Sequence, residues 1–203
     1  MLLTGEGLFD VASDLPSGAP QPGGRVAAPG RLGLLQAFAN THFDLVGEHG
    51  ADLFATPAGL RRWLADRQLL ASRARVTAAD LGRVLVIREG LRDLIADRAR
   101  SADSGALNQA LAGAALEVRV TPRGAELVPV GSSEVDRALG SVLAILAAAI
   151  VDGSWLRLKV CPGRHCGWVF YDNSRNNSGR WCSMSVCGGR EKARAHYHRQ
   201  RSH

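Results

Sequence analysis

The chain has 203 residues, of which 46% are hydrophobic and 22% are charged. This length and composition support one hydrophobic core with room for a second, smaller module, and they exclude a disordered chain. The longest apolar run, residues 142–151, is about half of the roughly 20 residues that a membrane-spanning helix needs. The N-terminus shows no basic, apolar secretory signal, so we expect a cytoplasmic protein.

The formal net charge of +6 conceals an asymmetry along the chain. Residues 157–203 hold ten Lys or Arg against two acidic residues, a net charge of +8, whereas residues 1–156 hold 15 basic and 17 acidic residues. A local excess of one sign points to a partner of the opposite sign. The last quarter of the chain is therefore the part expected to contact a polyanion.

The first half of the chain predicts an arm followed by three helices. Pro and Gly are frequent in residues 16–30, which favours a flexible N-terminal arm over residues 1–30. Apolar residues at helical spacing predict a first helix over 32–41, and Pro57 opens a second. Thr77 and Asp80 form a capping-box pattern before residues 81–95, whose apolar period of 3.6 predicts a long helix.

Residues 107–153 predict a hairpin between two further helices. A short helix is expected near residues 107–112, and strict alternation then predicts a strand over 116–120. Thr121-Pro122-Arg123-Gly124 has turn residues, so residues 125–130 are expected to return as the second strand of a β-hairpin. A long apolar helix follows Ser132-Ser133 and ends near Asp152-Gly153. We expect an α+β fold, mostly helical, with a helical N-terminal domain over 31–156 and a small C-terminal module over 157–203.

All four cysteines lie in the C-terminal module, in two C-x4-C pairs: Cys161 with Cys166, and Cys182 with Cys187. Tetrahedral Zn²⁺ needs four sulfur or imidazole ligands, and two tight turns supply them in pairs. Residues 167–171 read as a strand, and a helix start near Cys182 would favour thiolate charge. The pattern predicts a structural zinc module with four cysteine ligands, treble-clef-like or ribbon-like; disulfides, free thiols, or a redox or other metal site are the alternatives.

The immediate surroundings of the cysteines bear on this site. Four thiolates leave no open position for water, which argues against catalytic zinc. His165 is a possible substitute ligand, but it adjoins Cys166, so we expect it at the surface. A zinc ion with four thiolates carries a net charge of −2, which Arg164, Arg180 and Arg190 can partly offset.

The C-terminal module resembles the CGNR zinc finger family. The resemblance rests on Leu-Lys-Val-Cys at 158–161, Cys-Gly-Trp-Val-Phe-Tyr-Asp-Asn-Ser-Arg-Asn at 166–176, Arg-Trp-Cys-Ser-Met at 180–184 and Cys-Gly-Gly-Arg at 187–190. It implies that the four cysteines are zinc ligands and that the module binds DNA. The family has Asn where this chain has Gly189.

A weaker resemblance extends upstream. Residues 35–41, 57–64 and 107–111 are similar to the helical ABATE domain that accompanies this finger in bacterial stress-induced transcription regulators. The resemblance implies a regulator whose N-terminal domain senses a small ligand or mediates assembly, with a homo-oligomer as one form.

A basic C-terminal helix is the expected DNA contact. Arg190, Arg194 and Arg201 fall on one helical face, with Lys192 and Arg199 on its flanks. The candidate nucleic-acid-binding residues are Arg175, Arg180, Arg190, Lys192, Arg194, Arg199 and Arg201. A solvated tail is the alternative. RNA is less favoured, because aromatic residues beside a zinc site more often form its core than stacking surfaces; here they are Trp168, Phe170, Tyr171 and Trp181.

No enzyme motif is present in the sequence: there is no Walker A loop, no G-x-S-x-G and no G-x-G-x-x-G after a strand. His42, Asp44, Glu48 and His49 gather near one another, but they supply neither a full ligand set nor a nucleophile, so we interpret them as an exposed connector. Two other readings stay open. One is a zinc-stapled protein-interaction module without nucleic-acid binding, and the other is a ligand-binding protein or enzyme centred on the helical domain.

Overall fold

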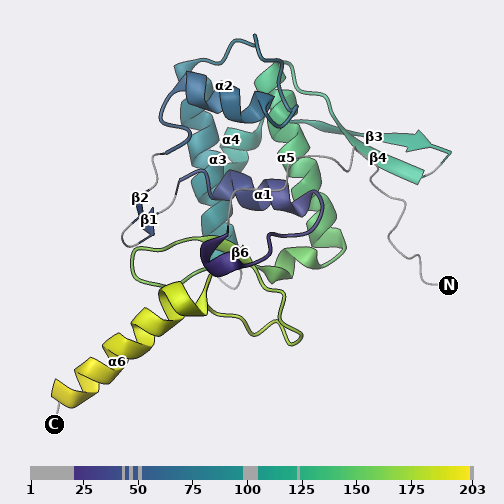
Figure 1. Ribbon diagram of the computed structural model, residues 1–203. Helices are drawn as coiled ribbons and strands as arrows, with labels where there is room; N and C mark the ends of the chain where they lie inside the picture. Colours follow the sequence, from purple (N-terminus) through teal and green to yellow (C-terminus); the bar gives the residue numbers. More distant parts are fainter. Residues whose placement is uncertain are drawn as a thin grey trace.

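The computed structural model describes residues 21–42, 44–45, 48–49, 52–97, 105–122 and 124–201. Figure 1 shows a helical body with a β-hairpin extending from one side and a single helix extending from the lower end. The body contains α1 (Leu32–Ala39), α2 (Pro57–Ala65), α3 (Ala78–Ala96), α4 (Gly105–Leu111) and α5 (Glu134–Val151). The expected α+β, mostly helical fold is confirmed.

Local capping determines where the long helices begin. The Thr77 side chain accepts a hydrogen bond from the Asp80 N–H, and the Asp80 carboxylate accepts one from the Thr77 N–H, which completes the expected capping box of α3. Ser133 and Asp136 form the same box at the start of α5. Such caps satisfy backbone N–H groups that have no partner within the helix.

The core is built around α1, all of whose residues are buried. This helix contacts both α3 and α5. An aromatic cluster closes one side of the core, with ring centroids 5.7 Å apart for Phe38 and Phe54 and 5.5 Å apart for Phe54 and Trp63. Because α1 has no polar face, it depends on being surrounded by the other helices.

The expected hairpin is confirmed as β3 (Leu116–Thr121) and β4 (Gly124–Pro129), paired antiparallel with Leu116 opposite Pro129 and Thr121 opposite Gly124. A second short pair joins β1 (Asp44–Leu45) to β2 (Glu48–His49). None of the helices that the structure describes is long and apolar enough to cross a membrane.

The C-terminal module begins with the 3-10 turn η2 (Ser154–Arg157) and the antiparallel pair β5 (Leu158–Val160) and β6 (Val169–Tyr171). It ends with the π-helical turn η3 (Met184–Gly188), which runs into α6 (Gly189–Arg201). Trp155, Leu158, Val169 and Tyr171 belong to the same hydrophobic core as α1 and α5. The module is therefore fused to the helical body through a shared core.

Residues 21–30 differ from the expected flexible arm. They include the short 3-10 turn η1 (Pro22–Gly24), bury Ala28, and make hydrogen bonds to the C-terminal module. The Pro and Gly residues that suggested flexibility instead allow a close approach, because Gly23 has φ +66° and a Cβ there would lie 2.2 Å from the Ser183 Oγ. The rest of the expected arm, residues 1–20, lies outside the described residues.

Candidate metal centre and nucleic-acid interface

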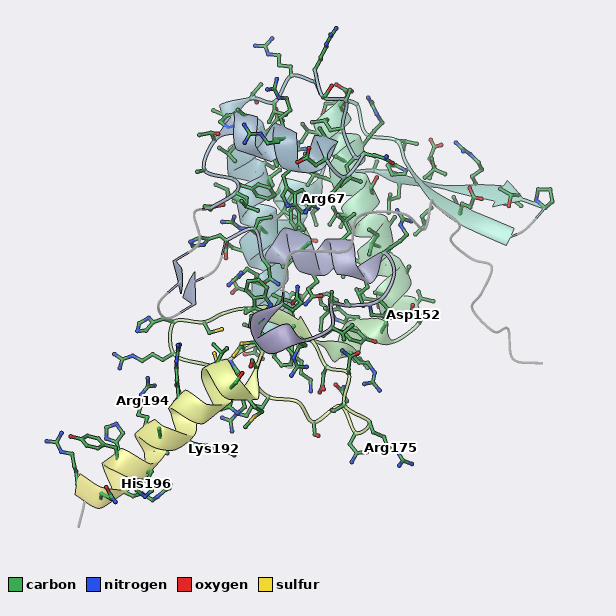
Figure 2. All side chains as sticks on the ribbon, viewed as in Figure 1. Arg67, Asp152, Arg175, Lys192, Arg194 and His196 are labelled. Atoms are coloured by element: carbon green, nitrogen blue, oxygen red, sulfur yellow. The ribbon has the colours of Figure 1, made fainter. Side chains whose placement is uncertain are left out.

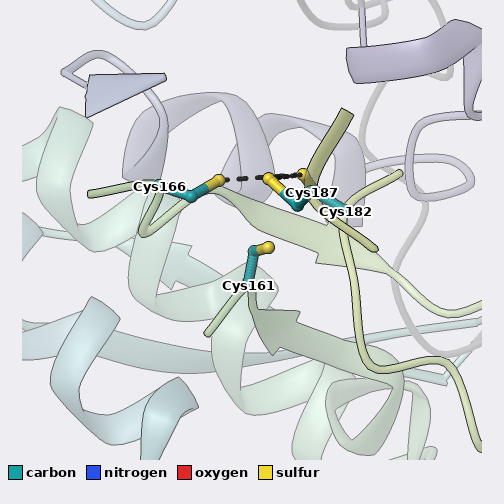
Figure 3. A group of neighbouring side chains, drawn as sticks. All are labelled: Cys161, Cys166, Cys182 and Cys187. Atoms are coloured by element: carbon teal, nitrogen blue, oxygen red, sulfur yellow. Dashed lines mark hydrogen bonds between the residues drawn. The ribbon is translucent and has the colours of Figure 1, made fainter. Parts of the chain in front are cut away.

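The four cysteines are brought together in the C-terminal module. All four are buried, and their Sγ atoms lie within 4.8 Å of one another. Figure 3 shows the sulfur of Cys161 facing the other three sulfurs from the opposite side of the cluster. The two sequence pairs therefore form one cluster, with no disulfide among these cysteines.

The spacing of the sulfurs fits a tetrahedral metal. A Zn–S bond of about 2.3 Å places sulfurs at the corners of a tetrahedron about 3.8 Å apart. The Cys166–Cys182 and Cys182–Cys187 sulfurs are 3.7 Å and 3.5 Å apart. These distances exceed the roughly 2.05 Å of a disulfide bond and leave space for one ion. Four buried thiols with this geometry suit Zn²⁺ without an open coordination position.

The first pair is held by a tight turn after β5. The Cys161 N–H donates to the Trp168 carbonyl at 2.9 Å, and the Cys166 N–H donates to the Gly163 carbonyl at 2.9 Å. Gly163 is buried, and a Cβ there would lie 3.1 Å from the Cys187 Sγ. A side chain at this position would press into the sulfur cluster, so glycine is needed for close packing.

The second pair lies at the start of a helix, as the sequence predicts. The Ser183 side chain caps η3 by accepting from the Val186 N–H, and the Ser183 carbonyl accepts from the Cys187 and Gly188 N–H groups at 3.0 Å. The N-terminus of this helical segment therefore lies beside Cys182 and Cys187. Its partial positive charge stabilises thiolates there.

The proximity of the thiols controls their protonation when no metal is bound. Hydrogen bonds from Cys166 and Cys182 lower the pKa of Cys161. The same contacts raise the pKa of Cys166 and of Cys182, and burial raises the pKa of Cys187. A divalent cation that binds four thiolates must therefore displace protons from the cluster.

Aromatic residues form the small core of this module. Trp168 and Phe170 are 2% and 0% exposed and pack with the four cysteines, and Trp181 packs against the same cluster. Tyr171 lies in the main core. These positions leave the four aromatics poorly placed to stack on bases, which agrees with the reading of them as core residues.

Two arginines from the N-terminal part of the chain support the module, and the sequence analysis missed both. Arg25 donates to the carbonyls of Cys182, Trp181 and Tyr171 at 2.7, 3.0 and 3.0 Å, and its guanidinium lies 4.7 Å from the centre of the Phe170 ring. Arg92 on α3 donates to the Gly167 carbonyl at 2.7 Å, next to Cys166. Because each of these contacts joins residues at least 75 positions apart, no local sequence pattern indicates them.

The arginines expected to offset the cluster charge lie further out. Arg164, Arg180 and Arg190 are exposed. The Arg164 side chain donates to His165, which is also exposed, as expected. The cations in hydrogen-bond contact with the backbone of the cysteine turns are thus Arg25 and Arg92.

Part of the basic excess is internal to the module. Lys159 forms an ion pair with the buried Asp172, with its Nζ 2.7 Å from the carboxylate, and also donates to the carbonyls of Asn177 and Gly179. Arg157 donates to the carbonyls of Asp172 and Ser174. These two cations organise the loop over residues 172–179 and are not available to a polyanion.

The remaining candidate cations are mostly at the surface. Arg175 and Arg180 are exposed on the loop before Cys182, and α6 carries five more cations with no buried residue. Figure 2 shows Lys192 and Arg194 on opposite sides of α6 and Arg175 at the tip of a separate loop. At about 100° per residue, Lys192 and Arg199 lie opposite Arg190 and do not flank it. The helix therefore carries its basic residues on two opposite sides.

Arg194 of α6 is held by an acidic neighbour on the same helix. Its guanidinium is paired with Glu191, 2.7 Å from the carboxylate, and the Glu191 carboxylate also accepts from the Arg164 N–H. Glu191 is the single acidic residue of α6. It therefore neutralises part of the charge near the beginning of the helix and leaves the outer turns strongly basic.

The polar cluster near residues 42–49 is described only in part. His42 is half-buried, and its carbonyl accepts from Arg92 at 3.0 Å. The side chains of Asp44, Glu48 and His49 lie outside the described residues. The structure describes a pocket elsewhere, between the end of α3 and the metal module. It is lined by Ile95, Ala96, Lys159, Val160, Pro162, Gly179 and Arg180.

Comparison with protein families matches most of the chain. Residues 32–153 match the ABATE family, described as "Putative stress-induced transcription regulator", and residues 157–200 match the CGNR zinc finger. The chain belongs to the ABATE family. The family matches and the cysteine geometry agree on a zinc finger at the C-terminus of an ABATE domain. No curated protein matches the chain.

The departure of this CGNR finger at Gly189 falls at the start of α6. Gly189 is exposed and has helical backbone angles, with φ −63° and ψ −43°. A Cβ at this position would lie 3.3 Å from the Met184 carbonyl oxygen, a contact that needs only a small adjustment. The backbone therefore does not require glycine here, and the structure gives no physical reason for the change.

Proposed function

We propose that this ABATE-family chain is a transcription regulator that binds DNA through its zinc finger, with α6 as the main contact. In this proposal Cys161, Cys166, Cys182 and Cys187 ligate one structural Zn²⁺. The ion would hold the turn that starts α6 in place, because Cys182 and Cys187 lie on either side of Ser183, which caps that segment.

The observation that carries the proposal is the character of α6. It is a 13-residue helix with no buried residue, five Arg or Lys and one Glu, and it extends away from the body (Figure 1). A helix of about this length is marginal in water unless something packs against it. A helix of this charge can neutralise phosphates on DNA, and that contact would also stabilise it.

The position of the aromatics favours duplex DNA over single-stranded RNA. Recognition of single strands depends on exposed rings that stack on bases. The finger buries the large rings of Trp168 and Phe170, whereas the rings that α6 exposes are those of Tyr197, His196 and His198. The Arg201 guanidinium lies 5.6 Å from the centre of the Tyr197 ring. The exposed surface is thus mainly cationic.

The test is the salt dependence of duplex DNA binding by the zinc-loaded full chain. Each phosphate contact contributes about −0.9 to the slope of log affinity against log salt. Replacing Arg199 and Arg201 together with Gln should weaken binding at all sequences and reduce the size of the slope by about 2. The matched control is Arg61→Gln with Arg62→Gln, an exposed pair on α2 at the other end of the molecule.

Three results would overturn the proposal. One is the absence of duplex binding by the full chain at low salt, which would favour the zinc-stapled protein-interaction module. A second is an equal loss of duplex DNA binding in the α6 and α2 variants. That result would indicate a general effect of charge and no specific role for α6. Binding to single-stranded RNA in preference to duplex DNA would assign the finger to the other nucleic acid.

A further inference from the structure

Within the part of the chain that the structure describes, the β3–β4 hairpin leaves an apolar surface uncovered. Alternate residues of the two strands put Leu116, Val118 and Val120 on one face, together with their partners Pro129, Leu127 and Ala125. The base of this face packs on α5, where a Cβ at Gly140 would lie 2.9 Å from the Pro129 Cβ. Further out, Val118 and Val120 are 67% and 83% exposed, and Figure 1 shows the hairpin extending past the helices.

Among the described residues the outer edge of β3 is also open, because its sheet has two strands and β4 pairs with the other edge of β3. The Val130 N–H donates to the Ala115 carbonyl at 3.0 Å, which makes this a hydrogen-bonded pair. Such pairs alternate along an antiparallel ladder. The N–H and C=O groups of Leu116, Val118 and Val120 therefore point away from β4.

Apart from the charges of Glu117 and Arg119, this edge lacks the features by which proteins prevent strand addition. β3 contains no Pro and no Lys, and its register with β4 continues without a bulge from Leu116 to Thr121. A regular, exposed and partly apolar edge is a template for another strand. An isolated two-stranded hairpin is also only marginally stable in water, so a further strand would stabilise it.

The charges on the opposite face of β3 select the partner. Glu117 and Arg119 flank Val118 symmetrically. If two copies of β3 pair antiparallel with Val118 opposite Val118, then Glu117 of each copy lies opposite Arg119 of the other. Leu116 lies opposite Val120, and the outward N–H and C=O groups of these three residues meet. Centring the pair on Glu117 or Arg119 would instead oppose like charges and turn the wrong backbone groups toward the partner.

We infer that this chain forms a two-fold symmetric dimer in which β3 pairs with β3 of a second copy, making a four-stranded sheet. The two apolar faces then lie on the same side of that sheet and form one continuous surface with Val118 at its centre. Such an interface uses the same patch on both copies, as two-fold symmetry requires. The inference does not depend on DNA binding and is tested without nucleic acid.

The test is the oligomeric state of the full chain, measured by sedimentation equilibrium from micromolar to near-millimolar concentration. The wild type should be dimeric in this range. Glu117→Arg should raise the dimer dissociation constant about tenfold, because two like-charged pairs replace two complementary ones. Arg119→Glu should do the same for the same reason. Asp93→Arg, a charge reversal of the same kind at an exposed position of α3, is the matched control and should leave the dimer intact.

Mixing the two charge variants supplies the decisive result. An equimolar mixture of Glu117→Arg and Arg119→Glu chains should form a mixed dimer, because each strand then carries two like charges that face two opposite charges. Val118→Pro should abolish the dimer in every mixture, because it removes an N–H that points away from β4 while sparing the hairpin ladder. A monomeric wild type, unchanged affinity in both charge variants, or no mixed dimer would each overturn the inference.

Discussion

At the scale of single residues, Asp172 shows how a polar loop acquires a fixed shape. Its carboxylate is buried and accepts hydrogen bonds from the Lys159 Nζ, the Gly179 N–H and the Ser174 N–H at 2.7, 2.6 and 3.0 Å. Burial alone would raise the pKa of Asp172, but the hydrogen bonds from Lys159, Ser174 and Gly179 outweigh it and hold this pKa well below its usual value. The loop that leads from β6 toward Cys182 is thus closed around one ion pair.

Replacing Asp172 with Asn should destabilise the chain by about 3 kcal/mol at neutral pH, because Lys159 keeps its charge in a partly buried place without its counter-ion. The measurement is urea unfolding of both proteins across pH. A depressed native pKa contributes stability above the unfolded pKa of about 3.9 and loses it as pH falls further. The difference in unfolding free energy between the wild type and the Asp172 variant should therefore be largest near neutral pH and should shrink below about pH 4.

The control for this experiment is Asp93→Asn, at an exposed position of α3. Surface changes of this kind alter unfolding free energy by less than about 0.5 kcal/mol. Equal stability of wild type and the Asp172 variant near neutral pH would contradict the role assigned to the ion pair.

At the scale of elements, the segment around η1 acts as a strap over the metal module. Gln21 accepts from the Trp168 Nε1 at 3.0 Å and from the Gln36 Nε2 at 2.8 Å, so it joins the finger to α1. Arg25 then donates to three carbonyls of the module. The strap lies outside both family matches, which begin at residues 32 and 157.

Arg25→Ala should therefore weaken the module without changing any cysteine. The carbonyls of Trp181 and Cys182 lose their donor, and the unfolding free energy should fall by about 2 kcal/mol. Release of Zn²⁺ to a chelator should be faster in this variant, since Cys182 is held less firmly. Arg73→Ala, at an exposed arginine, should release the metal at the wild-type rate. If the Arg25 variant released Zn²⁺ at the wild-type rate, the strap would not support the metal site.

At the scale of the whole molecule, hydrogen bonds join the ABATE domain to the finger. Asn40, at the end of α1, donates to the Val169 carbonyl at 2.7 Å and accepts from the Val169 N–H at 2.8 Å, so its side chain pairs with β6 as a strand would. Arg92 bridges the same region, because one nitrogen donates to the carbonyls of Ala39 and His42 and another to that of Gly167. These contacts therefore connect the backbone of the finger directly to α1 and α3.

Removal of zinc should consequently reach beyond the finger. A chelator is expected to lower hydrogen-exchange protection in α1 together with β6, because loss of the cysteine turns frees Val169, to which Asn40 is bonded. Hydrogen exchange measured by mass spectrometry reports the protection of each segment separately. The β3–β4 hairpin, which lies away from the metal module in Figure 1, is the internal control and should keep its protection. Unchanged protection in α1 would mean that the finger unfolds on its own.

Much of the fold followed from local patterns. The capping residues Thr77 and Ser133, the alternation over 116–120 and the turn at 121–124 each predicted an element that the structure contains. Helix starts, strand alternation and turns are set by residues close together in the chain, so a sequence records them directly. The spacing of the cysteines likewise predicted that they form one cluster.

Other features arose only from tertiary contacts. Arg25 meets Cys182 across 157 positions and Asn40 meets Val169 across 129, and in each case a side chain binds backbone groups, whose chemistry is the same at every residue. No spacing or residue type can therefore identify the partner. For the same reason the sequence placed residues 21–30 in a flexible arm and counted Arg157 and Lys159 with the surface charge. The order of residues alone specified most of the elements, the set of cysteines and the basic last helix. Folding settled how the finger is held, because burial and distant backbone partners exist only in the folded chain.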